Sequence, residues 1–152
     1  MVSKVMMSIC ALMVVGVLSG VLGNVGLVDD ATELRSILRG FCELADQLER
    51  SGSEASVSWD VPFMSSGGTI TLSISSGVVR GVCGGESAVC EPRAPLHLWR
   101  YDGYALNRTL VEELAGSEPS LTTASGHVLE IRTEYVIFEN QAALFVFVFA
   151  VR

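Results

Sequence analysis

The stretch VMMSICALMVVGVLSGVLGNVGLV, residues 5–28, places the strongest constraint on how this chain folds. It is apolar and uncharged, and the nearest charges are Lys4 before it and Asp29 and Asp30 after it. As an α-helix, its 24 residues would extend roughly 36 Å, which is enough to span a bilayer with some tilt. A helix this apolar is not stable alone in water, so we expect it to lie in a membrane or against copies of itself.

The charges at the two ends of this stretch predict its direction. A basic residue before an apolar run and acidic residues after it favour a start that faces the cytoplasm. A cleaved secretory signal is the alternative, although its apolar core is normally shorter, about 7–15 residues. We therefore expect residues 1–28 to be retained, as an apolar helix for a filament core or a membrane.

Glycines recur within the apolar stretch at the spacing that brings helices close together. Gly16 and Gly20 form a GxxxG pattern, and Gly23 and Gly26 follow. Small residues at this spacing let helix backbones approach one another, so we predict helix packing at Gly16, Gly20 and Gly23. The alternative is that glycine is simply common in membrane helices.

Composition limits the classes of function. The 152 residues carry a net charge of −7, which argues against binding to nucleic acid or to an anionic membrane surface. Beyond the apolar stretch, about 100 or more residues remain, enough for one modest domain. Serine, glycine, valine and threonine dominate that part, which favours an extracellular β domain.

Residues 29–50 continue the helical pattern with a different character. Their apolar side chains recur every three or four residues, the stripe of an amphipathic helix, with charged residues on the other faces. Ser51 and Gly52 end the pattern. We predict one continuous helix from about residue 4 to residue 50, apolar all round in its first half. The stripe is formed by Leu34, Ile37, Leu38, Phe41, Leu44, Ala45 and Leu48.

After Gly52 the period of apolar residues changes from 3.6 to 2, which predicts a β domain over residues 51–152. Thr109 and Glu112 fit a capping box for a short helix that ends near Gly116, and Glu139-Asn140 fits a hairpin turn. The predicted fold class is α+β, with a long N-terminal helix followed by an antiparallel, sandwich-like β domain. Its strand-like runs are residues 57–63, 69–75, 78–82, 96–104, 128–134 and 142–151.

The last strand-like run is apolar on both faces, so both faces must be covered. We expect the amphipathic half of the long helix on one face and a second sheet layer on the other.

Four cysteines are present. Cys83 and Cys90 bracket the loop VCGGESAVC, and we predict a disulfide between them, with two free thiols as the alternative. A metal site is not expected, since there is no CxxC and no histidine at ligand spacing to both. Cys10 and Cys42 fall in helical stretches and are expected to be small buried hydrophobic residues.

The pattern of polar residues does not predict an enzyme. His97 and His127 are the two histidines, and both are expected to face solvent. The sequence contains no nucleophile elbow, zinc-protease motif, phosphate loop or dinucleotide fingerprint. We expect no catalytic site, no cofactor and no metal.

The triplet Asn107-Arg108-Thr109 is a sequon for N-linked glycosylation. It falls in a predicted loop at a helix start, on the expected exterior. The competing role is that Thr109 caps the short helix instead.

The layout resembles the type IV pilin superfamily, especially the archaeal pilins. The resemblance rests on residues 1–28, on TELRSILRGFCELADQLERSGS (32–53), and on VSWDVPF and TITLSISSGVV after it. It implies that N-terminal helices bundle into a filament core with the β domains outside, after removal of a short basic leader. Bacterial members usually carry a glutamate at the fifth mature position, where this chain has Val5, which favours the archaeal branch.

Three functions fit these features. The first is a structural subunit of an extracellular filament on the cell surface, inserted in the membrane before it assembles with copies of itself, for adhesion or surface contact. The second is a single-span membrane protein whose small extracellular β domain binds a partner or ligand. The third is a secreted enzyme with an uncleaved signal, which the missing catalytic residues disfavour.

Overall fold

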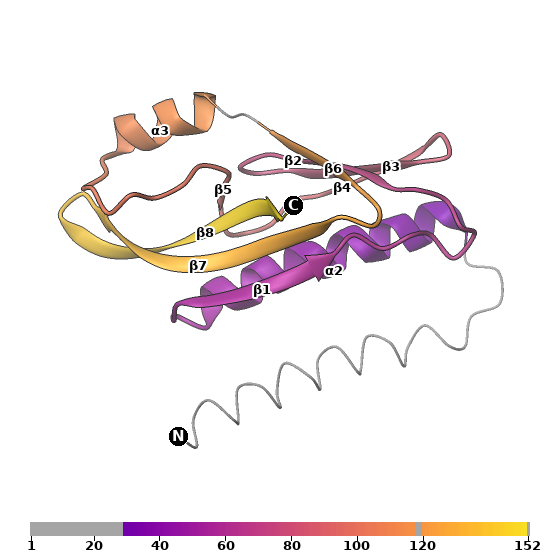
Figure 1. Ribbon diagram of the computed structural model, residues 1–152, viewed down its shortest axis with the longest axis horizontal. Helices are drawn as coiled ribbons and strands as arrows, with labels where there is room; N and C mark the ends of the chain where they lie inside the picture. The colour runs from indigo at the N-terminus through magenta and orange to yellow at the C-terminus, as the bar shows by residue number, and fades with distance from the viewer. Residues whose placement is uncertain (1–28, 118–119, 152) are drawn as a thin grey trace, which may run out of the picture.

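The computed structural model describes residues 29–117 and 120–151, and within them the chain forms two helices and eight strands (Figure 1). In chain order these are α2 (Asp30–Arg50), β1 (Ala55–Asp60), β2 (Thr71–Ile74), β3 (Val79–Cys83), β4 (Glu86–Cys90), β5 (Leu96–His97), α3 (Arg108–Ser117), β6 (Leu121–Ala124), β7 (Val128–Phe138) and β8 (Gln141–Val151).

The strands form two four-stranded sheets. One sheet has the order β1-β7-β8-β5 and the other β4-β3-β2-β6. The pairs are antiparallel except β5 with β8, which is parallel, with Leu96 opposite Val146. The sheets are thus not purely antiparallel, and the run predicted as a strand over residues 96–104 is a strand only at Leu96–His97.

The predicted fold class is wrong about its long N-terminal helix. Helix α2 has 21 residues and begins at Asp30, and Asp29 has φ −53° and ψ 130°, an extended conformation that ends helical geometry. Asp29 occupies the N-cap position, and Asp30 and Glu33 place negative charge in the first turn, where the helix dipole favours it. The acidic pair that follows the apolar stretch therefore lies at the start of α2. The preceding part of the predicted helix lies outside the described residues.

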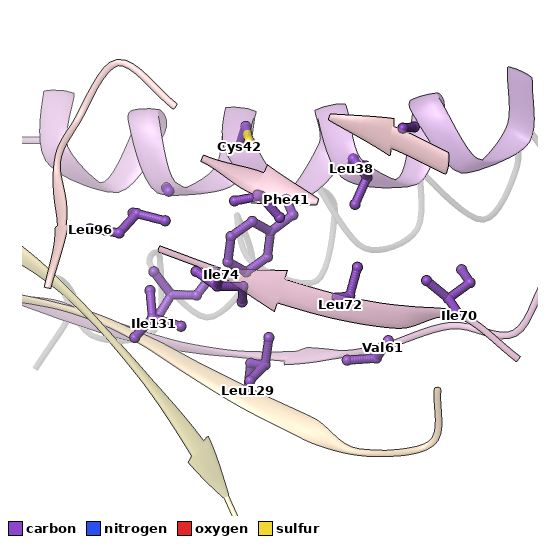
Figure 2. Close-up of a cluster of buried hydrophobic side chains, with 14 of the residues drawn as sticks. Leu38, Phe41, Cys42, Val61, Ile70, Leu72, Ile74, Leu96, Leu129 and Ile131 are labelled. Atoms are coloured by element: carbon purple, nitrogen blue, oxygen red, sulfur yellow. The ribbon is translucent and has the colours of Figure 1, made fainter. Parts of the chain in front are cut away.

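The main core lies where α2 meets both sheets (Figure 2). Phe41 projects from the middle of α2, is fully buried, and meets the ring of Trp59 on β1 edge to face at 5.0 Å between centroids. Around it gather aliphatic residues from both sheets, including Leu72 and Ile74 on β2 and Ile131 on β7. The amphipathic stripe of the sequence is therefore buried, as its period predicted.

A second, smaller core covers the other face of β8. Phe145 and Phe147 of β8 pack against Trp99, Phe149 stacks on Phe147, and apolar residues of α3 close the cluster. Figure 1 shows α3 and α2 on opposite sides of the molecule. Both faces of β8 are covered, as predicted, but the outer cover is α3 and the segment after β5 and not the second sheet that the sequence predicts.

Two carboxylates fasten α2 to the loops beside it. Glu33 accepts hydrogen bonds from the backbone N–H of Ser65 at 2.8 Å and from its hydroxyl at 2.6 Å. Asp46 accepts from the backbone N–H groups of Arg93 and Ala94 at 2.9 and 3.2 Å. Each carboxylate satisfies loop donors that no strand pairs, which fixes both ends of the helix on the sheets.

Turn residues set the strand register where the sequence predicted hairpins. Glu139 and Asn140 join β7 to β8 with φ values of 50° and 66°, the geometry of a type I′ turn, so the predicted turn is confirmed. Gly84 and Gly85 join β3 to β4 with φ values of 58° and 92°.

Across the part of the chain that the structure describes, neither helix is long and apolar enough to cross a membrane.

We expect Gly81→Val to destabilise the domain. Gly81 lies on β3 directly beneath α2, and a Cβ there would sit 3.1 Å from methyl carbons of Leu34 and Leu38. Overpacking of this kind costs about 1–3 kcal/mol. Urea unfolding of the full chain in mild detergent, followed by tryptophan fluorescence, measures the loss.

The matched control is Gly40→Ala on α2, where an added Cβ meets nothing within 4 Å. Removing glycine from a helix interior is expected to stabilise the domain by about 0.5–1 kcal/mol. A wild-type midpoint in Gly81→Val would contradict the close approach of α2 to β3.

Candidate functional site

The predicted helix-packing glycines, Gly16, Gly20 and Gly23, lie outside the described residues, as does Cys10. The packing prediction thus stays a prediction. The other singled-out residues fall in three places on the domain: the β3–β4 hairpin, the start of α3, and a pocket beside β5.

The register of β3 and β4 contradicts the predicted disulfide between Cys83 and Cys90, which are free thiols in the structure. In the β3–β4 hairpin Cys83 lies opposite Glu86, while Cys90 lies opposite Val79. The tight turn at Gly84 therefore leaves the two cysteines at opposite ends of the ladder, four residues or roughly 13 Å apart. A disulfide needs Cα atoms closer than about 7 Å, so this register forbids the bond.

The two cysteine side chains also face different neighbours. The Cys83 sulfur is packed against the 64–68 turn, where a Cβ on Gly68 would meet it at 2.7 Å. Cys83 and Cys90 both pack in the main core, Cys83 beside that turn and Cys90 at the opposite end of the β3–β4 ladder. Cys42 is buried on α2, which confirms the sequence interpretation.

Asn107 caps helix α3. Its side-chain oxygen accepts a hydrogen bond from the backbone N–H of Leu110 at 2.8 Å. Thr109 lies inside the helix, so the predicted capping box is wrong and the residue before the helix supplies the cap. Asn107 is exposed, which is compatible with the glycosylation that the sequon predicts. A glycan on the amide nitrogen would leave the capping oxygen in place.

A pocket of about 340 Å³ opens between α3, β5 and the end of α2. Its walls are mainly apolar, with Glu49 and Glu112 as the acidic residues among them. The complete lining is Glu49, Ser76, Ala94, Pro95, His97, Val111, Glu112, Ala115, Leu144, Phe145 and Val146.

His97 lines this pocket and is buried, so the expectation that it faces solvent is wrong. Its ring stacks on Phe145 at 4.5 Å between centroids and tilts against Trp99 at 5.3 Å. Burial lowers the pKa of His97 from its ordinary 6.5 to about 4, so the imidazole is neutral at physiological pH. His127 is exposed, as predicted.

The pocket can accept a small apolar group beside a neutral imidazole. Among the residues that the structure describes, Nδ1 of His97 has no hydrogen-bond partner, so neither Ser76 nor an acidic residue of the lining orients the ring through that atom. In triad-type sites a histidine base is oriented by a further group in such contact. The absence of enzymatic activity stays a prediction.

Within residues 29–117 and 120–151, no three His, Cys, Asp or Glu side chains gather closely enough to hold a metal ion.

The burial of His97 escaped sequence reasoning. Residues 97 and 99 share one face of an extended segment, and both are aromatic, which matches the phenylalanine face of β8. This match between residues 97 and 99 and the phenylalanines of β8 was the signal in the sequence that could have predicted the burial of His97.

We expect His97 to make the domain less stable as the pH falls. Between about pH 6.5 and pH 4 the unfolded chain takes up a proton on His97 while the folded chain does not. The free energy of unfolding therefore falls through this window, by up to about 3 kcal/mol. His97→Phe should lose this part of the pH dependence, and the exposed His127→Phe should keep it. Superimposable wild-type and His97→Phe profiles in urea unfolding would contradict the burial.

A pair of variants tests the α3 cap without interference from the sequon. Asn107→Ala and Thr109→Ala both destroy the sequon, but only the first removes the oxygen that accepts from Leu110. We expect Asn107→Ala to lose about 1 kcal/mol of unfolding free energy relative to Thr109→Ala. Equal stability of the two variants would contradict the cap.

Comparison of the chain with models of known protein families, with curated proteins and with solved structures gives no match. The functional argument therefore depends on the residues and geometry of the chain itself.

Proposed function

We propose that this protein is a structural subunit of an extracellular, type IV pilus-like filament that polymerises through its apolar N-terminal segment. The supporting observation is that very few residues separate this segment from the first helix of the domain along the chain. The apolar run ends at Val28 and α2 begins at Asp30, so Asp29 is the sole residue between them. Flexible tethers between an anchor and a domain are normally longer and rich in glycine, serine or proline.

Burial of the apolar segment between subunits supplies the driving force for assembly. Each Å² of apolar surface removed from water contributes about 25 cal/mol, so even half the surface of such a segment contributes many kcal/mol per subunit. The partners are copies of the same chain, with a membrane as the environment before assembly. Filaments of this kind at the cell surface would serve adhesion or surface contact.

The second candidate is a single-span membrane protein with a small extracellular β domain that binds a partner. Asp29 favours this candidate, since its extended backbone interrupts the helix that would run unbroken through a filament subunit. The domain also has, beside His97, a pocket that a small ligand could occupy.

The two candidates predict that the protein is recovered in different cell fractions. Under the filament proposal, shearing intact cells without detergent releases the protein as filaments visible by electron microscopy. Recovery in membranes alone, soluble solely with detergent, would contradict the filament and support the single-span protein.

We expect Gly20→Leu to abolish filaments and leave the β domain folded. Leucine at the GxxxG position keeps the segment apolar but prevents close approach of helix backbones. Val17→Leu in the same stretch is the matched control, since it adds a carbon without touching the motif, and it should assemble normally. Negative-stain microscopy of the shear fraction, together with circular dichroism of the purified chain, gives both readouts. Normal filaments from Gly20→Leu would contradict the packing.

A further inference from the structure

One ridge of α2 faces the sheet that contains β3 and β4. Residues 34, 38, 42 and 46 are spaced by four and therefore lie along one side of the helix. Leu34 and Leu38 lie over Gly81 on β3. Asp46 accepts hydrogen bonds from Arg93 and Ala94, just beyond the end of β4. Cys42 lies between these two contacts, one turn of helix from each.

Strand β4, which lies against this ridge, places Cys90 at the level of Cys42. Gly81 pairs with Ala88 on β4, and Cys90 lies two residues further along the same face. Ala88 is buried beneath the helix, and Cys90 packs against the cluster that contains Cys42. Among the strands of the described residues, β4 is the one that α2 contacts most extensively. The helix ridge and the strand face thus bring Cys42 over Cys90.

Cys42 and Cys90 belong to the same packed cluster, and the Cys90 thiol lies close enough to Cys42 to affect its pKa. Burial raises the pKa of the Cys42 thiol, and the contact with Cys90 raises it further. Cys90 is partly exposed, while Cys42 is buried. A soluble oxidant therefore reaches Cys90 first. Figure 2 shows Cys42 on α2 beside Leu38 and Phe41, at the edge of the main core.

We propose that Cys42 and Cys90 form a disulfide that joins α2 to the edge strand β4 when the protein reaches an oxidising compartment. The oxidant is a disulfide, either of a thiol oxidoreductase or of glutathione. The Cys90 thiolate attacks one sulfur of that disulfide and displaces a thiolate, and the Cys42 thiolate then attacks the Cys90 sulfur and displaces the second. Two cysteine thiols are oxidised, the oxidant disulfide is reduced to two thiols, and the two thiol protons pass to the departing sulfurs.

This bond would close a loop of about fifty residues that contains β1, β2 and β3. Cross-links over loops of this length stabilise by restricting the unfolded chain. We expect the midpoint of thermal unfolding to rise by roughly 10 °C on oxidation. The proposal is independent of the filament, because a membrane-anchored domain would carry the same bond.

Peptide mapping of the full chain tests the pairing. The chain, carrying Cys10→Ser and held in mild detergent, is equilibrated with oxidised and reduced glutathione, alkylated at low pH and digested without reductant. Trypsin leaves Cys83 and Cys90 on one peptide, so a second cut after Glu86 by a glutamate-specific protease is needed. The expected product links the Cys42 peptide to the Cys90 peptide, with Cys83 alkylated.

Matched variants ensure that the test does not depend on one variant being able to fold. In the same background, Cys83→Ser should retain both the cross-link and the rise in thermal midpoint, and Cys90→Ser should lose both. An alkylated Cys42, a Cys83–Cys90 pairing, or glutathione retained on Cys90 beside a free Cys42 would each overturn the proposal. The mapping of the Cys10→Ser chain alone decides the pairing, even where Cys90→Ser fails to fold.

Discussion

Burial of the apolar face of α2 is the interaction on which the rest of the domain depends. The two sheets share no strand, and the buried side chains of this helix pack in one cluster with residues of both. Phe41 contacts Trp59 of one sheet, while Leu34 and Leu38 lie on Gly81 of the other. A larger residue at position 81 would lift the helix from one sheet and open the core to water. The helix thus covers one side of the domain and joins both sheets in one core.

Local patterns in the sequence predicted the elements that depend on near neighbours. The stripe from Leu34 to Leu48 predicted α2, since three- and four-residue spacing is a property of one helix. Period-two runs predicted β1, β2, β3 and the first part of β7, and Glu139-Asn140 predicted the hairpin because its backbone suits two positive φ values. These features are encoded within a few residues, so sequence alone was sufficient for them.

The wrong predictions concern distant partners or competing local signals. Asp29 and Asp30 fit both the end of an apolar segment and the start of a helix, and the structure has the helix start. His97 was expected in solvent because its partners, Phe145 and Trp99, pack on it only after β5 joins β8. The predicted Cys83–Cys90 bond used proximity in sequence, whereas the register of β3 and β4 separates the two sulfurs. No candidate pocket was predicted, since its walls come from five separate segments.

The hydrogen bonds that hold α2 to its neighbouring loops connect the fold with the proposed filament. In a filament held together by residues 1–28, tension on a subunit reaches the domain through Asp29 and the start of α2. Glu33 resists that tension first, through its hydrogen bonds to Ser65, and Asp46 resists it near the other end of the helix. Hydrogen bonds at exposed sites open readily, whereas a bond from Cys42 to Cys90 would hold the middle of the helix covalently. A domain whose core depends on one helix gains most from a cross-link at that helix.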